Sequence, residues 1–264
     1  MLRFEALLAL GVLFFYLYDS LMLLNVNELI VQKSFRKWSY RFPVFGFQIL
    51  RKFPLIMNLL MPNFLVFNLS WPSPKEEMDS DKLETLIQSL LPLQIIASLL
   101  LLLIIFVLPV VAFFFDSGPE LLTLFIFIYL LIIFSVCYLI ICRDSLGLSG
   151  SKASSIAFEC ILCPPFAINI ARKVSMNYEI GSDPFDCSKT LFDKQTFELF
   201  KADLTSLLKT NIKYHEKDSA RYNELKNYLN DLSHNERVNF LGFQYFINHL
   251  SKKGHTDIIK KIEN

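Results

Sequence analysis

Glycine is scarce in this chain, with 8 residues in 264, and the formal charge is nearly balanced. Few glycines disfavour the glycine-rich loops that cradle phosphate groups and the glycine-packed helix bundles of transporters. The net charge of +1 gives no reason to expect nucleic-acid binding, which depends on an excess of basic side chains. The sequence also has no internal repeat and no low-complexity tract.

Common catalytic spacings are missing as well. There is no His-Glu-x-x-His motif, no Walker phosphate loop, no dinucleotide fingerprint and no Gly-x-Ser-x-Gly sequence. None of the four histidines is spaced with a cysteine or carboxylate as a metal-ligand set would be; they are His215, His234, His249 and His255. We therefore expect no cofactor, no bound metal and no enzymatic activity.

Cysteine is present in an odd number, which argues against a disulfide framework. The five cysteines are Cys137, Cys142, Cys160, Cys163 and Cys187. Cys160 and Cys163 have a spacing that could chelate zinc or exchange disulfides. No second such pair exists, and the apolar surroundings favour protonated thiols. We interpret these cysteines as buried structural residues, with a metal or redox site as the alternative.

Two long apolar runs dominate what is present. Leu90–Phe115 and Leu121–Cys142 contain no charged residue and are separated by residues 116–120. Each run is long enough to cross a hydrocarbon core of about 30 Å as a helix. The pair therefore predicts a transmembrane helical hairpin over residues 90–142, and Pro109 predicts a kink in its first helix.

A third apolar run occupies Leu2–Leu24. It has almost no basic n-region and no small-residue cleavage site, so we expect an uncleaved transmembrane helix over residues 1–24 and not a signal peptide. Glu5 and Asp19 are 14 residues apart in the sequence, which places them within about 40° of one helix face. They are either two interfacial acids or one polar face that lines the interior of a helix bundle.

Residues 25–89 form the expected cytoplasmic connection between the first span and the hairpin. Its first part alternates cations with aromatic residues, which is typical of an anchor in the lipid headgroup region; the anchor residues are Arg36, Lys37, Trp38, Tyr40 and Arg41. Phe53–Leu69 is uncharged but contains Pro54 and Pro62. At about 17 residues it is short for a span, so we expect a re-entrant or interfacial element over residues 53–69.

Residues 143–175 form an expected interfacial segment. Within it, Ser155–Arg172 is apolar but short, contains Glu159 and is broken by two consecutive prolines. We expect it to lie in the interface or to pack under the helix bundle, with Arg172 and Lys173 at the level of the headgroups. Glu159 is expected to pair with one of these two cations.

The last segment, residues 176–264, changes to a soluble pattern. Apolar residues recur with helical spacing in two stretches, over residues 197–212 and 222–232, and Ser233 and Glu236 have the spacing of a capping box that opens a further helix. We expect a small helical domain with one modest core.

The basic residues are distributed unevenly about the apolar runs. The turn of the hairpin carries Asp116 and Glu120 and no cation, whereas the 25–89 connection and the segment after Cys142 are rich in lysine and arginine. Because basic loops remain in the cytoplasm, we expect the N-terminus outside and the C-terminus in the cytoplasm. The compact size and short loops suggest a bacterial inner (plasma) membrane.

Together these patterns predict an all-α integral membrane protein with three transmembrane helices, interfacial or re-entrant elements and a small helical cytosolic C-terminal domain. The leading functional interpretation is a non-enzymatic protein whose residues 176–264 bind a protein partner, in one version a toxin-neutralising (immunity) or defence-associated protein. One alternative is a homo-oligomeric channel or membrane-perturbing effector gated by the cytosolic domain, with Glu5 and Asp19 facing a pore. The other is an interfacial lipid-processing enzyme that uses Glu159, Cys160 or Cys163.

Overall fold

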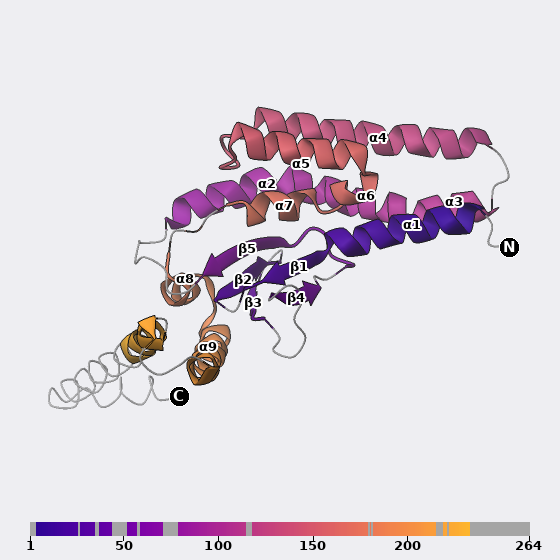
Figure 1. The fold of residues 1–264 in the computed structure, drawn as a ribbon. Helices are drawn as coiled ribbons and strands as arrows, with labels where there is room; N and C mark the ends of the chain where they lie inside the picture. The colour runs from indigo at the N-terminus through magenta and orange to yellow at the C-terminus, as the bar shows by residue number, and fades with distance from the viewer. Residues whose placement is uncertain are drawn as a thin grey trace, which may run out of the picture. The chain divides into compact units, whose positions relative to one another are not determined.

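The computed structural model describes residues 4–25, 27–34, 37–43, 52–56, 59–70, 79–114, 118–178, 180, 182–214, 219–220 and 222–232. The chain divides into two compact units, Met1–Glu198 and Leu199–Asn264, and each is described here by itself. In the first unit, helices pack on one another and on small antiparallel sheets (Figure 1).

Three helical rods form the apolar part of the first unit. They are α1 (Phe4–Asp19), a long rod made of α2 (Ser80–Leu101), η1 (Leu102–Val107) and α3 (Leu108–Phe114), and α4 (Gly118–Ile141). The η1 segment is a π-helical stretch that ends just before Pro109. Proline lacks the N–H that an α-helix needs and clashes with the carbonyl one turn earlier, so a widened turn at this place accommodates it. The kink expected at Pro109 stays a prediction, and the structure shows a π-helical stretch before this proline.

Five short strands lie between α1 and α2 in the sequence. β1 (Leu21–Leu24) pairs with β4 (Phe53–Ile56), and β2 (Glu28–Lys33) lies between β3 (Trp38–Arg41) and β5 (Leu65–Ser70). All pairs are antiparallel, and Val31 in β2 lies opposite both Tyr40 and Phe67. The central strand is buried on both faces, since Leu29, Ile30 and Val31 are all inaccessible to solvent.

The expectation of an all-α fold is wrong because of these strands. Phe53–Leu69, which we expected to be a re-entrant or interfacial element, contains β4 and most of β5. Hydropathy alone does not distinguish one apolar helix of about 17 residues from two buried strands joined by a turn. Pro54 fits the second arrangement, because β4 belongs to a two-stranded sheet in which every strand is an edge.

The expectation of three transmembrane helices is wrong as well. Two helices of the described chain are long and apolar enough to cross a membrane, Ser80–Phe113 and Pro119–Ile141. α1 has 16 residues, and at 1.5 Å per residue it reaches about 24 Å, which is short of a hydrocarbon core of about 30 Å. It contacts η1 and α3 of the long rod and also α6.

Residues 150–176 form a helical hairpin that turns at two prolines. α5 (Gly150–Leu162) packs along α4, α6 (Pro164–Ala167) contacts α1, and α7 (Ile170–Met176) lies between α2 and β5 (Figure 1). The side chain of Ser175 accepts a hydrogen bond from the backbone N–H of Val66 at 2.9 Å. This contact covers a donor on the edge strand of the sheet, which would otherwise be open to pairing with another chain.

The remaining helices are more polar in sequence than the long rods. α8 (Pro184–Leu191) belongs to the first unit, and α9 (Lys194–Tyr214) crosses the boundary between the units. The apolar stripe expected in α9 is present, with Phe200, Leu204, Leu207 and Leu208 buried. A further helical stretch covers residues 222–232. The helix expected after Ser233 lies outside the described residues.

Candidate functional site

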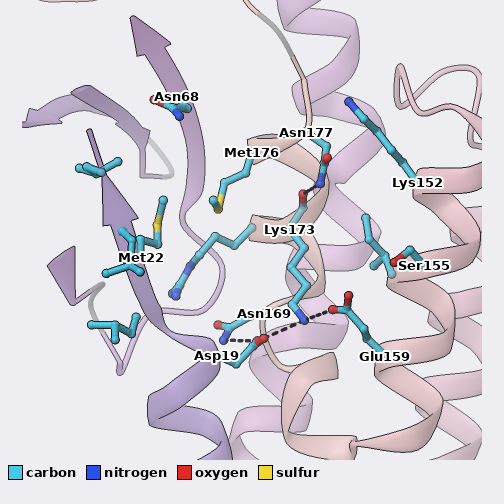
Figure 2. Close-up of a pocket in the computed structure, with 15 residues that line it drawn as sticks. Asp19, Met22, Asn68, Lys152, Ser155, Glu159, Asn169, Lys173, Met176 and Asn177 are labelled. Carbon is cyan, nitrogen blue, oxygen red and sulfur yellow. Dashed lines mark hydrogen bonds and ion pairs between the residues drawn. The ribbon is translucent and has the colours of Figure 1, made fainter. Parts of the chain in front are cut away.

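A lysine held between two carboxylates joins three elements of the first unit (Figure 2). The Lys173 ammonium group, on α7, lies 2.8 Å from a carboxylate oxygen of Asp19, the last residue of α1. It also lies 2.7 Å from a carboxylate oxygen of Glu159, on α5. We call these three residues the charge cluster. The pairing of Glu159 with a following cation is thus present, and the partner is Lys173.

The amide of Asn169 extends the charge cluster. Its Nδ2 group donates to Asp19 at 2.9 Å and to the hydroxyl of Ser20 at 3.1 Å. Asn169 precedes Lys173 by one helical turn, so the two side chains lie on the same face of the chain. One turn of helix therefore supplies both groups that hold the end of α1.

The charges of the cluster compensate one another, beginning with the Asp19 carboxylate at the end of α1. A carboxylate at a helix C-terminus is unfavourable because the helix dipole places negative charge there. Burial lowers the pKa of Lys173, but the charge of Asp19 and hydrogen bonds from the lysine to Asp19 and Glu159 outweigh it, so that this pKa is raised. Lys173 therefore stays charged at neutral pH, and the stabilisation that its charge provides is lost as the pH rises above about 10.4.

Arg172 is the most deeply buried cation near the cluster, with 2% of its surface exposed. Burial lowers the pKa of its guanidinium group, and the neighbouring Tyr16 and Asp19 act in the opposite direction. Protein therefore encloses Arg172, and its expected place at the headgroup level stays a prediction.

A cavity of about 530 Å³ lies beside these residues, which is within the usual range of about 300–1,000 Å³ for ligand pockets. It is lined by β1, by one residue of β5 and by faces of α5 and α7. Its charged lining consists of three cations and two carboxylates: Lys152, Arg172, Lys173, Asp19 and Glu159. Figure 2 shows Asn68 on the sheet and Lys152 on α5, on opposite sides of the helix that carries Lys173, with Asn169 and Glu159 close to the Lys173 side chain.

The structure thus brings together four of the candidate residues that the sequence indicates: Asp19, Glu159, Arg172 and Lys173. Glu5 lies on α1, but its side chain is outside the described residues. The sequence reasoning missed Asn68, Lys152 and Asn169 as parts of the site. Of these, Asn169 could have been inferred from the sequence, because it precedes Lys173 by four residues and so lies on the same helix face.

The described residues of the expected headgroup anchor lie around the edge of the three-stranded sheet. Arg36 lies outside the described residues, and the other four lie on or next to β3: Lys37, Trp38, Tyr40 and Arg41. The indole of Trp38 packs against Phe67 at 5.9 Å between ring centroids, and the ring of Tyr40 packs against Phe192 at 5.7 Å. These aromatic side chains contribute to packing around the sheet.

The two cysteines of the Cys-x-x-Cys sequence are free thiols. Burial raises the pKa of Cys160 to about 12, and burial also raises that of Cys163. Metal binding and thiol exchange both require a thiolate, so this environment suppresses both reactions. Among the described residues, no group of three or more His, Cys, Asp or Glu side chains could hold a metal ion.

Comparison with known proteins gives no family. No family model matches the chain, no curated protein is similar to it, and no solved structure matches it. The chemistry of the site therefore rests on its geometry: an ion-pair cluster of one lysine and two carboxylates beside a cavity that both polar and apolar side chains line.

The two carboxylates of the charge cluster should differ in their importance for stability. The Asp19 side chain is 10% exposed and the Glu159 side chain is 45% exposed. We expect Asp19→Asn to lower the free energy of unfolding by up to about 3 kcal/mol, and Glu159→Gln to lower it by about 1 kcal/mol or less. Denaturant unfolding of the purified protein in detergent measures both free energies. The matched control is Asp186→Asn, at an exposed position of α8. Equal losses for the two variants would contradict the unequal burial.

Thiol alkylation tests the state of the Cys-x-x-Cys sequence. With a pKa of about 12, Cys160 should resist iodoacetamide in the folded protein at pH 7.5 and should react readily after denaturation. Mass spectrometry of the alkylated peptides measures the two rates, and the denatured protein serves as the control. Rapid alkylation of Cys160 in the folded protein would instead indicate an activated thiol.

Proposed function

We propose that the protein is a non-enzymatic integral protein of a bacterial inner membrane that acts by binding. Its long helices hold the first unit in the bilayer, and its C-terminal helices bind a protein partner on the cytoplasmic side. The observation that carries the membrane location is the exposed apolar surface of the two long helices.

This surface is too large and too continuous for a helix in contact with water. In the most apolar 18-residue windows of Ser80–Phe113 and Pro119–Ile141, only 33% and 28% of the residues are buried. The core helix of a soluble protein would be mostly buried. Exposed aromatic side chains occur along both helices, including Phe106, Phe113, Phe127 and Phe134. A contiguous apolar surface of this kind is typical of a membrane-facing region.

The proposed orientation follows from the basic residues. The hairpin turn contains two acidic residues and no cation, and the segments at the other ends of both long helices contain lysine and arginine. The positive-inside rule then places the turn outside and α5 to α9 in or next to the cytoplasm. The polar half of α5, which exposes Ser151, Lys152 and Ser155, lies on the same side as these cations.

A binding role fits the chemistry of the charge cluster better than catalysis does. Lys173 is engaged by two carboxylates, and a cation with a raised pKa is a poor general base at neutral pH. Asp19 is engaged by Lys173 and Asn169, which differs from the water-facing carboxylates of a cation pore. These contacts favour the binding proposal over the enzyme and channel alternatives.

The orientation can be tested with reporters at the C-terminus. A fluorescent protein fused after Asn264 should be bright in cells, and a periplasmic phosphatase at the same position should be inactive, because the proposed C-terminus is cytoplasmic. The protein should also stay in the membrane pellet after extraction at alkaline pH. An active phosphatase would overturn the orientation, and release by alkali would overturn the membrane location.

Partner binding by the second unit can be tested at Leu199. This residue of α9 is 58% exposed, which makes it the apolar contact we expect a partner to cover. Cross-linking and capture with full-length protein should recover a partner with the wild type, and Leu199→Asp should abolish the recovery. Lys209→Asp, an exposed position about 15 Å farther along the helix, is the control. Equal recovery with Leu199→Asp would argue against this surface.

A further inference from the structure

We propose that the free edge of β1 binds an extended segment of a partner polypeptide, which adds to the two-stranded sheet as a further strand. This edge is the side of β1 that faces away from β4, and it borders the cavity beside the charge cluster. The site lies in the first unit, and it is independent of the surface at Leu199 that we propose for the second unit.

The pairing of β1 with β4 determines which backbone groups of β1 lie on the free edge. Pro54 lies opposite Leu23 and has no N–H to donate to the ladder. In an antiparallel ladder, residue pairs that exchange hydrogen bonds alternate with pairs that do not. Leu23 and Pro54 therefore form a pair without hydrogen bonds, and so do Leu21 and Ile56, two residues away. The N–H and C=O groups of Leu21 and Leu23 consequently point away from β4.

The cavity borders this edge of β1. All four residues of β1 line it, although successive side chains of a strand point to opposite faces of the sheet, and none of the four residues of β4 lines it. The backbone groups of Leu21 and Leu23 form no hydrogen bond with any described residue outside the ladder. Both residues are partly exposed, so these groups are open to a ligand that carries donors and acceptors in the spacing of a strand.

Two other strand edges of the first unit are protected, in contrast to that of β1. On β5, the Ser175 hydroxyl accepts the outward N–H of Val66 at 2.9 Å. On β4, Pro54 removes a donor from the outer edge. The outward positions of β1 are leucines, which neither remove a donor nor add a charge. Because natural sheets protect open edges by proline, charge or cover, an edge without them is a template for another strand.

The walls of the cavity indicate that a peptide occupies the edge and not a second copy of the chain. Figure 2 shows Met22 on the side of the strands and Ser155 and Glu159 on the side of the helices, and α5 and α7 both line the cavity. A second copy would bring the same two helices beside its own β1, so the helices would meet before the edges could pair. Ile156 and Met176 also line the cavity, and they would contact apolar side chains on one face of the added strand.

The test begins with peptides selected from a phage-displayed library of random linear sequences on the full-length protein in lipid nanodiscs. Two N-methylated versions of one selected peptide then carry methyl groups on alternate amides, one on the odd and one on the even positions. The version whose methyl groups face β1 should bind about tenfold more weakly than the parent, because it cannot donate to the edge, and the other should bind equally well. The protein is unchanged in this comparison, so folding does not affect it. Equal binding by the two versions would overturn the proposal.

A proline variant locates the binding site on β1. Leu23→Pro removes an N–H from the free edge and leaves the hydrogen bonds to β4 in place, so we expect a melting temperature close to that of the wild type. It should weaken binding of the selected peptide about tenfold. Ile56→Pro is the matched control, because it removes an outward N–H from the opposite edge of the same sheet, and it should leave binding unchanged. Wild-type binding by Leu23→Pro would contradict the proposed site.

The remaining outcomes separate the possible occupants of the edge. A library that yields no binding peptide would refute the proposal, and so would a protein dimer that Leu23→Pro dissociates, since that result would assign the edge to a second copy. Leu199→Asp should leave peptide binding unchanged. Peptide binding that this variant abolishes would show that the peptide binds the second unit and would overturn the site on β1. A failure at β1 leaves the proposed partner surface of the second unit untouched.

Discussion

Lys173 holds the first unit together by pairing with carboxylates from opposite ends of its sequence. Asp19 ends α1, Glu159 lies on α5, and the lysine between them lies on α7, which also contacts α2 and the edge of the sheet. The end of α1 would otherwise carry an uncompensated carboxylate against its own dipole. Because β1 follows directly after Ser20, the position of α1 also sets where the sheets begin.

The cluster contributes more to specificity than to net stability. Two charges taken out of water lose hydration, and their attraction roughly offsets that loss. Removing one partner is nevertheless costly, because a buried charge is then left alone. The pairing thus disfavours any arrangement in which α1 packs elsewhere on the long apolar helices, where hydrophobic contacts are plentiful and give little preference for one position. Helices with apolar surfaces need such polar contacts to select one packing arrangement.

Local patterns made part of this structure predictable. The long apolar helices and the stripe of α9 follow from residues close in sequence. The link between Glu159 and Lys173 was also expected, since they lie 14 residues apart. The partner of Asp19 lies more than 150 residues away, and no local pattern carries that information. The strands were missed for a related reason. Hydropathy indicates that a segment is shielded from water, and this is true both of the buried strands β2 and β5 and of a membrane element.

α5 shows how the apolar and polar parts of the first unit are joined. Its first half exposes Ser151, Lys152 and Ser155, and its second half exposes Phe158 and Leu162. Glu159 lies where this change occurs, and there it meets Lys173. A carboxylate at the edge of an apolar surface is tolerated when a cation neutralises it, and a cation there is tolerated for the same reason. The charge cluster therefore lies at the boundary between the two surfaces, and under the proposed membrane location that boundary is the headgroup region.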